Sequence, residues 1–384
     1  MFQRKFFLVV FLSVFFLIIG SCSVTRSISR SLSNKPFPKL KFTISDEHKK
    51  YFSYLNTSDD LYEIYEEFEK LEDLGDKTCE MVYEFVKRDD AQITKFIQNV
   101  KLDPTPSKFS WTTGLYQRIL AGCWNFYMMN DQKTDRDFLL VKKLYPNLKK
   151  NCYSVGFSQP YMMHNILNCE NLASMDMDWR ILYAHSQMLK IFSEEKAKDS
   201  DTLSKAMAEM KIGWKAQYVS KPIKRESPVN YGTFCDKGRT ALCSEHFLKF
   251  QETLVTLKSF DFQLTKLNHT KLSSDPEIAN VIYFSNALDG EYTNAKEFSE
   301  LMKNVSDSLH PGKVAILMYH VGGMEGFGIY EARKSKEGKY SVKTVCKESY
   351  LLPIWYKNRG PITTHLDYAS VNRGYAPLCT ALIR

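Results

Sequence analysis

The residues with the clearest chemical potential lie around a glycine-rich segment, Gly322-Gly323-Met324-Glu325-Gly326-Phe327-Gly328. Backbone amides in such a segment can hold an anion. The apolar run Val314 to Tyr319 precedes it and predicts a strand whose carboxyl end lies where α/β sheets bind ligands. We therefore take His320 and Glu325 as a candidate pocket. A flexible turn is the alternative, because no helix that could face an anion follows the loop.

The chain has nine cysteines, and one of them, Cys22, lies in the N-terminal segment described below. The other eight can form up to four disulfides in an exported protein, and the sequence leaves their pairing open. They are Cys79, Cys123, Cys152, Cys169, Cys235, Cys243, Cys346 and Cys379. Cys235, Cys243 and His246 are three potential zinc ligands, but a zinc site needs a fourth ligand and closer cysteine spacing. We therefore predict a Cys235–Cys243 disulfide and no metal site.

Common catalytic motifs are absent from the sequence. It contains no Gly-x-Ser-x-Gly elbow, His-Glu-x-x-His helix or Gly-x-x-x-x-Gly-Lys-Ser/Thr loop, which removes the hydrolases and nucleotide enzymes that carry them. Asp176 and Asp178 lie close to His185 in the sequence, and we interpret these acids as the entry to a strand. We assign no catalytic residue.

The N-terminus has the order of a secretory signal peptide: Arg4 and Lys5, an apolar run from Phe6 to Ile19, and then Gly20-Ser21-Cys22. The apolar run is shorter than the roughly 20 residues that a membrane-spanning helix needs. The segment Ile19-Gly20-Ser21-Cys22 resembles the lipobox of bacterial lipoproteins. That resemblance implies a lipid on Cys22 and an exported, membrane-anchored lipoprotein that faces the periplasm or the cell surface.

An ordinary secretory signal cut beside Cys22 is the alternative, and it would leave a free secreted protein. In a eukaryotic secretory pathway the Asn-x-Ser/Thr sites at Asn56, Asn268 and Asn304 would be glycosylation acceptors. The formal net charge of +8, without an Arg-rich or Lys-rich tract, suits an anionic membrane surface but does not predict nucleic-acid binding. The expected partners are a membrane, through the lipid, and possible protein partners.

The segments of the chain differ in pattern. Residues 1–21 are the expected signal peptide, 22–40 a flexible tether, 41–105 an N-terminal helical region and 106–384 an α/β domain with an insertion at about 193–275. In the helical region Ser58 is the expected cap of a helix with Leu61, Ile64 and Phe68 on one face.

After Pro106, short apolar runs alternate with helical patterns, which is typical of an α/β fold. A helix from about Asn294 to Leu309 separates the last two parallel strands, and Gly328 to Arg333 and Tyr340 to Val345 form an antiparallel pair. The expected strands before this pair are Ile119 to Met128, Cys152 to Phe157, Trp179 to Ala184, Val281 to Ser285 and Val314 to Tyr319. Thr380 to Arg384 could add one more strand.

This order resembles the class I methyltransferase fold, a Rossmann-like, mostly parallel sheet that ends in an antiparallel pair. Asn280 to Asp289, the helix after it and Leu309-His-Pro-Gly-Lys-Val-Ala-Ile-Leu-Met318 look like the family's fourth strand, helix and fifth strand. Tyr153 to Met162 resembles its second strand. The resemblance covers about Trp111 to Arg384.

The family holds S-adenosylmethionine with a glycine-rich loop after its first strand, a carboxylate after the second and a polar side chain after the third. On this correspondence the three places fall at Ala121 to Asn125, at Gly156 and at His185. The loop then has only one glycine, Gly122, and the two other places lack an acid. The resemblance therefore implies a degenerate domain, without a cofactor, that acts as a binding or interaction module.

The alternative function is an active S-adenosylmethionine-dependent transferase with an atypical pocket. Its cofactor-binding residues would be Gly122, Gly156, Ser158, His185, Asn286 and Asp289. The two functions differ in one structural expectation. A transferase keeps an open cleft at the carboxyl edge of the sheet, whereas an interaction module can fill that cleft with Trp124, Phe157 and Tyr283.

Overall fold

The computed structural model describes residues 37–49, 52, 55–70, 131–210, 240–288, 292–321, 326–348, 365–372 and 375–383. All of these except Phe37 belong to one compact unit, Pro38–Arg384. Several expectations fall outside the described residues. They are the strand at 119–128, the lipid on Cys22, and the roles of Gly122, Trp124, Asp289 and Glu325.

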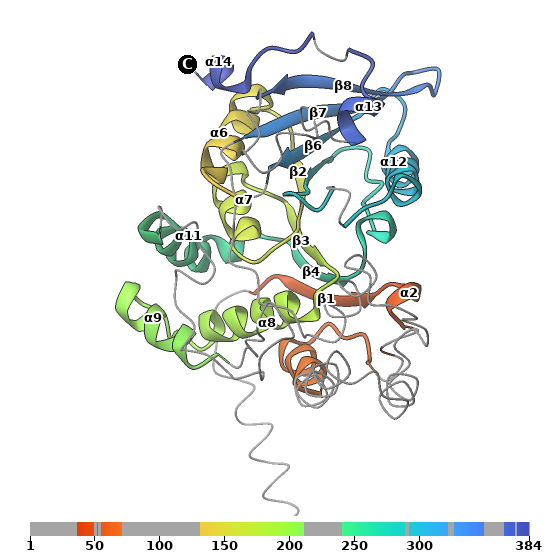
Figure 1. The fold of residues 1–384 in the computed structure, drawn as a ribbon. Helices are drawn as coiled ribbons and strands as arrows, with labels where there is room; N and C mark the ends of the chain where they lie inside the picture. Colours follow the sequence, from red (N-terminus) through yellow and green to blue (C-terminus); the bar gives the residue numbers. More distant parts are fainter. Residues whose placement is uncertain are drawn as a thin grey trace, which may run out of the picture. The chain divides into compact units, whose positions relative to one another are not determined.

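The unit is built around one eight-stranded sheet with the order β1-β4-β3-β2-β5-β6-β7-β8 (Figure 1). Neighbouring strands from β1 to β6 are parallel, and β6, β7 and β8 are antiparallel. The expected α/β class, with a mostly parallel sheet and a C-terminal antiparallel pair, is confirmed. The strands are β1 (Lys39–Ile44), β2 (Lys150–Ser154), β3 (Asn171–Asp176), β4 (Ser259–Leu264), β5 (Ala279–Tyr283), β6 (Val314–His320), β7 (Phe327–Lys334) and β8 (Tyr340–Lys347).

Helices cover both faces of the sheet, with α6, α7 and α11 on one side and α12 on the other (Figure 1). The helices are α2 (Asp46–Lys49), residues 61–70, α6 (Thr134–Leu144), α7 (Gln159–Leu167), α8 (Trp179–Ser193), α9 (Ser200–Ala208), α11 (Thr240–Thr253), α12 (Ala295–Ser308), α13 (His365–Ala369) and α14 (Cys379–Ile383). Two 3-10 turns, η2 (Leu254–Thr256) and η3 (Leu267–His269), flank β4.

The helix α12 forms as its sequence predicts. The side chain of Asn294 accepts hydrogen bonds from the backbone N–H groups of Lys296 and Glu297, and the Glu297 side chain bonds back to the N–H of Asn294. This capping box satisfies backbone donors that a helix start leaves unpaired. Phe298, Leu301, Met302 and Val305 recur at helical spacing and pack in one buried cluster with residues of the sheet.

Aromatic side chains fill the space between the sheet and the helices on its other face. The ring of Tyr161 in α7 lies 4.7 Å from that of Phe250 in α11 and 6.5 Å from that of Phe260 in β4, centroid to centroid. Tyr161 and Phe250 are fully buried. Such ring pairs add directional packing to the burial of apolar surface, and they pack α7 against α11 and β4.

Two predicted strands are helices in the structure. Trp179–Ala184 lies in α8, whose side chains are buried from Trp179 to Leu189. A helix buried on all sides has no polar face, so its apolar run was indistinguishable from a buried strand. The C-terminal residues from Cys379 to Ile383 form α14.

The expected domain limits also need correction. The strand β1 occupies Lys39–Ile44, where the tether and the helical region were expected to meet, and it pairs with β4. The expected insertion contains β4, which belongs to the central sheet. Residues 61–70 are helical as predicted, but the side chain that caps them is Asp60, which accepts from the N–H groups of Tyr62 and Glu63.

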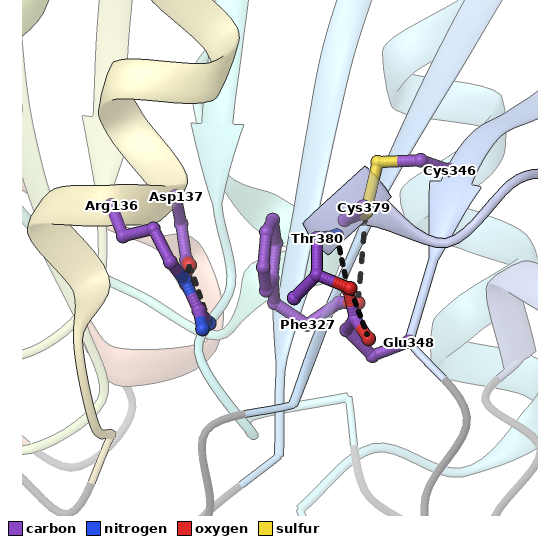
Figure 2. Close-up of a disulfide and its surroundings, with 7 residues drawn as sticks. All are labelled: Arg136, Asp137, Phe327, Cys346, Glu348, Cys379 and Thr380. Atoms are coloured by element: carbon purple, nitrogen blue, oxygen red, sulfur yellow. Dashed lines mark hydrogen bonds and ion pairs between the residues drawn. A yellow bond between two sulfur atoms is a disulfide. The ribbon is translucent and has the colours of Figure 1, made fainter. Parts of the chain in front are cut away.

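Two disulfides lie among the described cysteines. Cys152 in β2 pairs with Cys169, and Cys346 in β8 pairs with Cys379 in α14. Figure 2 shows the second pair beside Phe327, and the guanidinium of Arg136 lies 4.7 Å from the centre of the Phe327 ring. Cys243 is disulfide-bonded as well. None of the helices in the described part of the chain is long and apolar enough to cross a bilayer.

Candidate functional site: a cavity at the carboxyl edge of the sheet

The sheet reverses its strand order between β2 and β5. From β2 the chain adds β3 and then β4 on one side, whereas β5 and β6 follow on the other side. Such a reversal leaves a crevice outside the carboxyl ends of the two central strands, where α/β proteins bind ligands. A cavity of about 150 Å³ lies at this place. A cavity of about this size can hold one ring the size of benzene. It is partly open to solvent, so a larger ligand would place one ring inside it and extend beyond it.

The described part of the cavity wall comes from the end of β3, from the segments that follow strands β2 to β5, and from the start of α12. The lining residues are Val155, Gly156, Phe157, Gln159, Met175, Asp176, Met177, Asp178, Ile181, Thr265, Lys266, Leu267, Asn268, Ser285, Asn286, Ala287, Tyr292, Thr293 and Glu297.

Gly156 forms the turn between β2 and α7. Its φ of +77° lies in the left-handed region that favours glycine. A Cβ atom at this position would also lie 2.6 Å from Oε1 of Gln159, closer than atoms can pack. The turn therefore depends on glycine, and the backbone of Gly156 forms part of the cavity wall.

Asp176, the last residue of β3, lies next to this turn. Its Oδ2 accepts a hydrogen bond from the backbone N–H of Gly156 at 3.1 Å, and its Oδ1 accepts one from that of Asp178 at 2.9 Å. Protein surrounds the carboxylate, but the residue keeps partial solvent exposure and lines the cavity. Burial, with the nearby charge of Asp178 second, raises the pKa of Asp176 to about 7.

Asp178 is the N-cap residue of α8, and the guanidinium of Arg180 pairs with its carboxylate. Its carboxylate accepts from the backbone N–H of Arg180 and from the Arg180 guanidinium, at 2.9 Å to Nε and 2.6 Å to Nη2. Both side chains are buried. Within the described part of the chain, this bidentate pair leaves Asp176 as the carboxylate at this end of the cavity to which no cationic side chain is bonded.

Ser285 lies on the opposite wall, after β5. It has a φ of +51° without being a glycine, a conformation that costs energy and is common at functional sites. Its hydroxyl donates to Oδ2 of Asp131 at 2.5 Å, and the Tyr283 hydroxyl donates to the same oxygen at 2.7 Å. Asp131 has no solvent exposure.

His320 lies in the core and does not line the cavity, contrary to the expectation of a pocket there. Its Nδ1 is 3.5 Å from Oδ1 of Asp131 and its Nε2 is 3.4 Å from Oδ2 of Asp137, and all three side chains are without solvent exposure. Its nitrogens also lie 3.0 Å from the carbonyl oxygens of Val321 and Gln132. The strand β6 includes His320, and these contacts hold its ring beneath α6.

His185 also has a structural position. It lies in the middle of α8, where the strand Trp179–Ala184 was expected to end. It is therefore not at the end of a strand, and it cannot take the place of an acid there. Its Nε2 lies 3.2 Å from the carbonyl oxygen of Gly156, and its Nδ1 lies 2.7 Å from the hydroxyl of Tyr161. Burial lowers the pKa of His185 to about 3. The neutral ring therefore donates from Nε2 to Gly156 and accepts from Tyr161, which supports the turn from below.

Of the other predicted cofactor residues, Gly156 and Asn286 line the cavity. Ser158 is buried at the start of α7 and is not part of the lining. Phe157 forms part of the wall, and Tyr283 is turned to Asp131 and to the Phe138 ring, 5.1 Å away. These two aromatic residues do not fill the cavity.

The strand β2 lies between β3 and β5. The strand β3, which was not among the expected strands, ends at Asp176, 20 residues after Gly156. This acid was not among the site residues expected from the sequence. This spacing is the signal that could have identified it. Gln159 and Ser285 had no comparable signal.

Comparison with known proteins adds no family to these observations. No protein-family model matches the chain, and no curated protein matches it.

Proposed function

We propose that this protein binds a nucleoside ligand in the cavity at the carboxyl edge of its sheet, and that S-adenosylmethionine is that ligand. The observation that carries the proposal is the place of Asp176. It ends the strand next to β2, follows the Gly156 turn by 20 residues and lines the cavity. In nucleoside-binding α/β proteins a carboxylate at this place accepts hydrogen bonds from the ribose hydroxyls.

The residues present fit such a group. An ionised carboxylate has about four acceptor positions, and backbone N–H groups bond to the two oxygens of Asp176 once each in the hydrogen bonds described above. Gly156 has no side chain of its own, and the carboxamide of Gln159 lies beside the place that its Cβ would take. Oε1 of Gln159 lines the same space and is buried without a hydrogen-bond partner. A buried polar atom of this kind is costly unless a ligand or water pairs with it.

This proposal favours the second of the two functions expected from the sequence. S-adenosylmethionine, when bound, supplies an activated methyl group. The residues described here would bind and orient it: Asp176 holds the ribose, the backbone of Gly156 approaches it closely, and Asn286 faces it from β5. The degenerate interaction module is favoured less, because the cavity is open where Phe157 and Tyr283 were expected to close it.

Calorimetric titration of the purified protein with S-adenosylmethionine and S-adenosylhomocysteine tests the proposal. We expect binding in the micromolar range, a loss of at least tenfold in Asp176→Asn, and no change in Asp261→Asn. Asp261 is a matched control because it lies in the neighbouring strand β4 and outside the cavity lining. Absence of binding by a folded sample would overturn the proposal and restore the interaction module.

We also propose that the protein is exported and carries a lipid on Cys22. The disulfides Cys152–Cys169 and Cys346–Cys379 support an oxidising compartment. The intact mass of the mature protein distinguishes a lipidated Cys22 from a free secreted form. In a glycosylating host the mass would show a glycan at the exposed Asn56. Asn268 would carry none, because it is buried and its amide nitrogen donates to Glu300 at 2.7 Å.

A further inference from the structure

The cavity presents hydrogen-bond acceptors at three separate points of its wall, and this feature indicates what kind of ligand group it can take. The first acceptor is Asp176, whose oxygens accept from backbone N–H groups. A carboxylate in its ionised form has no proton to donate. A ligand group that pairs with it must therefore bring a donor.

The second acceptor is the hydroxyl oxygen of Ser285. A serine hydroxyl has one proton and two lone pairs. Its proton is directed to Asp131, at 2.5 Å, in preference to the Asn286 side-chain oxygen at 3.3 Å. Asp131 is fully buried and also accepts from Tyr283. The Ser285 oxygen at the cavity wall is consequently left with lone pairs only, and Asp131 is the positioning residue that keeps it so.

The third acceptor is Oε1 of Gln159 at the start of α7. The side chain is 4% exposed, and this oxygen has no hydrogen-bond partner. It lies beside Gly156, on the same side of the cavity as Asp176. An unpaired buried acceptor is unfavourable, so a ligand that places a hydrogen-bond donor here would gain affinity from this contact.

The charged side chains of the cavity wall also favour a ligand that brings hydrogen-bond donors. The described lining residues include the carboxylates of Asp176, Asp178 and Glu297 and one ammonium, that of Lys266. The ammonium is engaged by Glu297 at 2.8 Å and lies 3.5 Å from Glu47. Among the described lining residues no cationic side chain is therefore left over for a phosphate, which usually pairs with lysine or arginine.

From these acceptors and charges we infer that the cavity selects a ligand rich in hydroxyl and amino donors and rejects one that carries phosphate. Its substrate class is the nucleoside or the cationic nucleoside derivative, and not the nucleotide. This inference rests on the proposed function and goes beyond it, because it assigns the discrimination to Gln159 and to the Ser285–Asp131 pair.

The experiment is a calorimetric comparison of adenosine, S-adenosylmethionine, adenosine monophosphate and NAD on the same purified protein. We expect adenosine and S-adenosylmethionine to bind, and the two phosphate-bearing ligands to bind at least tenfold more weakly. Equal or tighter binding of adenosine monophosphate would overturn the inference while leaving a nucleoside site in place. Failure of all four ligands would overturn the proposed function instead.

Two variants locate the effect within the wall. Ser285→Ala removes the oxygen that accepts, and Gln159→Leu removes the unpaired acceptor while keeping an apolar chain of similar length. We expect each substitution to weaken adenosine binding about tenfold. We also expect it to reduce the ratio of the adenosine affinity to the adenosine monophosphate affinity. Thr256→Ala on the 3-10 turn η2, which lies outside the lining, is the control for hydroxyl loss. Thermal unfolding confirms that each variant is folded. Unchanged discrimination in both folded variants would contradict the assignment to these residues.

Discussion

The backbone N–H of Gly156 donates to the carboxylate of Asp176 across 3.1 Å. This bond joins the turn after β2 to the last residue of β3 and so links two neighbouring walls of the cavity. His185 supports the same turn from the opposite side, through the Gly156 carbonyl group. Polar contacts on both sides of Gly156 thus fix the turn that forms part of the cavity wall. Substitution of this glycine should therefore affect both stability and ligand binding.

Replacing Gly156 by alanine should lower the free energy of unfolding by more than the backbone conformation of this residue alone explains. A positive φ costs an L-residue about 1–2 kcal/mol, and the new Cβ would lie 2.6 Å from Gln159. Gly338→Ala is a matched control, because Gly338 has a φ of +85° and nothing within 4 Å of the added atom. We expect Gly338→Ala to lose only the stability that the positive φ costs an L-residue. We expect Gly156→Ala to lose more stability than that and to bind the ligand more weakly. Urea unfolding and titration of both variants measure this, and equal losses would contradict the account.

The raised pKa of Asp176 predicts a pH-dependent stability. A pKa of about 7 in the folded state against roughly 4 in an unfolded chain means that the folded protein binds more protons between these values. Stability therefore falls as the pH rises from about 4 to 7. Asp176→Asn removes the titrating group, so the loss of stability between pH 4 and pH 8 should be smaller in this variant than in the wild type. Its amide nitrogen would face a backbone N–H at every pH, so the pH dependence, and not the absolute stability, is the quantity to compare.

Urea unfolding at the two pH values measures the effect, with Asp201→Asn on the surface of α9 as the control. An Asp176→Asn variant whose stability changes between pH 4 and pH 8 as much as that of the wild type would contradict the raised pKa of Asp176. Because ribose hydroxyls would donate to the ionised form, ligand affinity should also increase from pH 6 to pH 8.

His320 should be important for stability although it is not part of the cavity wall. It lies between two carboxylates that have no solvent exposure, Asp131 and Asp137. Removing the His320 ring leaves the carbonyl oxygens of Val321 and Gln132 without this partner, and a lost buried hydrogen-bond partner costs about 1–3 kcal/mol. We expect this loss in His320→Ala and almost none in His310→Ala, since His310 is exposed. Comparable losses in the two variants on urea unfolding would refute the structural role.

The Cys152–Cys169 disulfide should stabilise the centre of the sheet. It closes a sequence separation of 17 residues, for which the loss of chain entropy in the unfolded state is worth about 3 kcal/mol. Since Cys152 lies on β2, just before the Gly156 turn, the double alanine variant should lose both stability and ligand affinity. The matched variant of Cys346 and Cys379 should lose stability alone, because this pair ties α14 to β8. Intact ligand affinity in the first variant would contradict this.

The sequence was sufficient for the parts of the fold whose patterns are local. The capped helix α12 and the hairpin of β7 and β8 were predicted close to their observed limits. The strand β3 was missed, because Asn171-Leu-Ala-Ser-Met-Asp176 has few of the branched and aromatic residues that mark strands. The apolar start of α8 was taken for a strand in its place.

The unrecognised strand also hid the candidate site. With β3 missing from the prediction, Asp176 was interpreted as the entry to a strand, whereas it is the last residue of one. The place of His320 could not be predicted either. Its partners Asp131 and Asp137 are far away in the sequence and meet it only after the sheet and α6 have packed.

The central claim is that Asp176 holds the ribose of a nucleoside ligand, and a crystal structure of the protein grown with S-adenosylhomocysteine tests it most directly. The account predicts the ligand in the cavity after β2 and β3, with ribose hydroxyl oxygens at hydrogen-bond distance, about 2.5–3.0 Å, from the Asp176 carboxylate. A ligand bound elsewhere, or an empty cavity at concentrations that saturate the protein in solution, would contradict it.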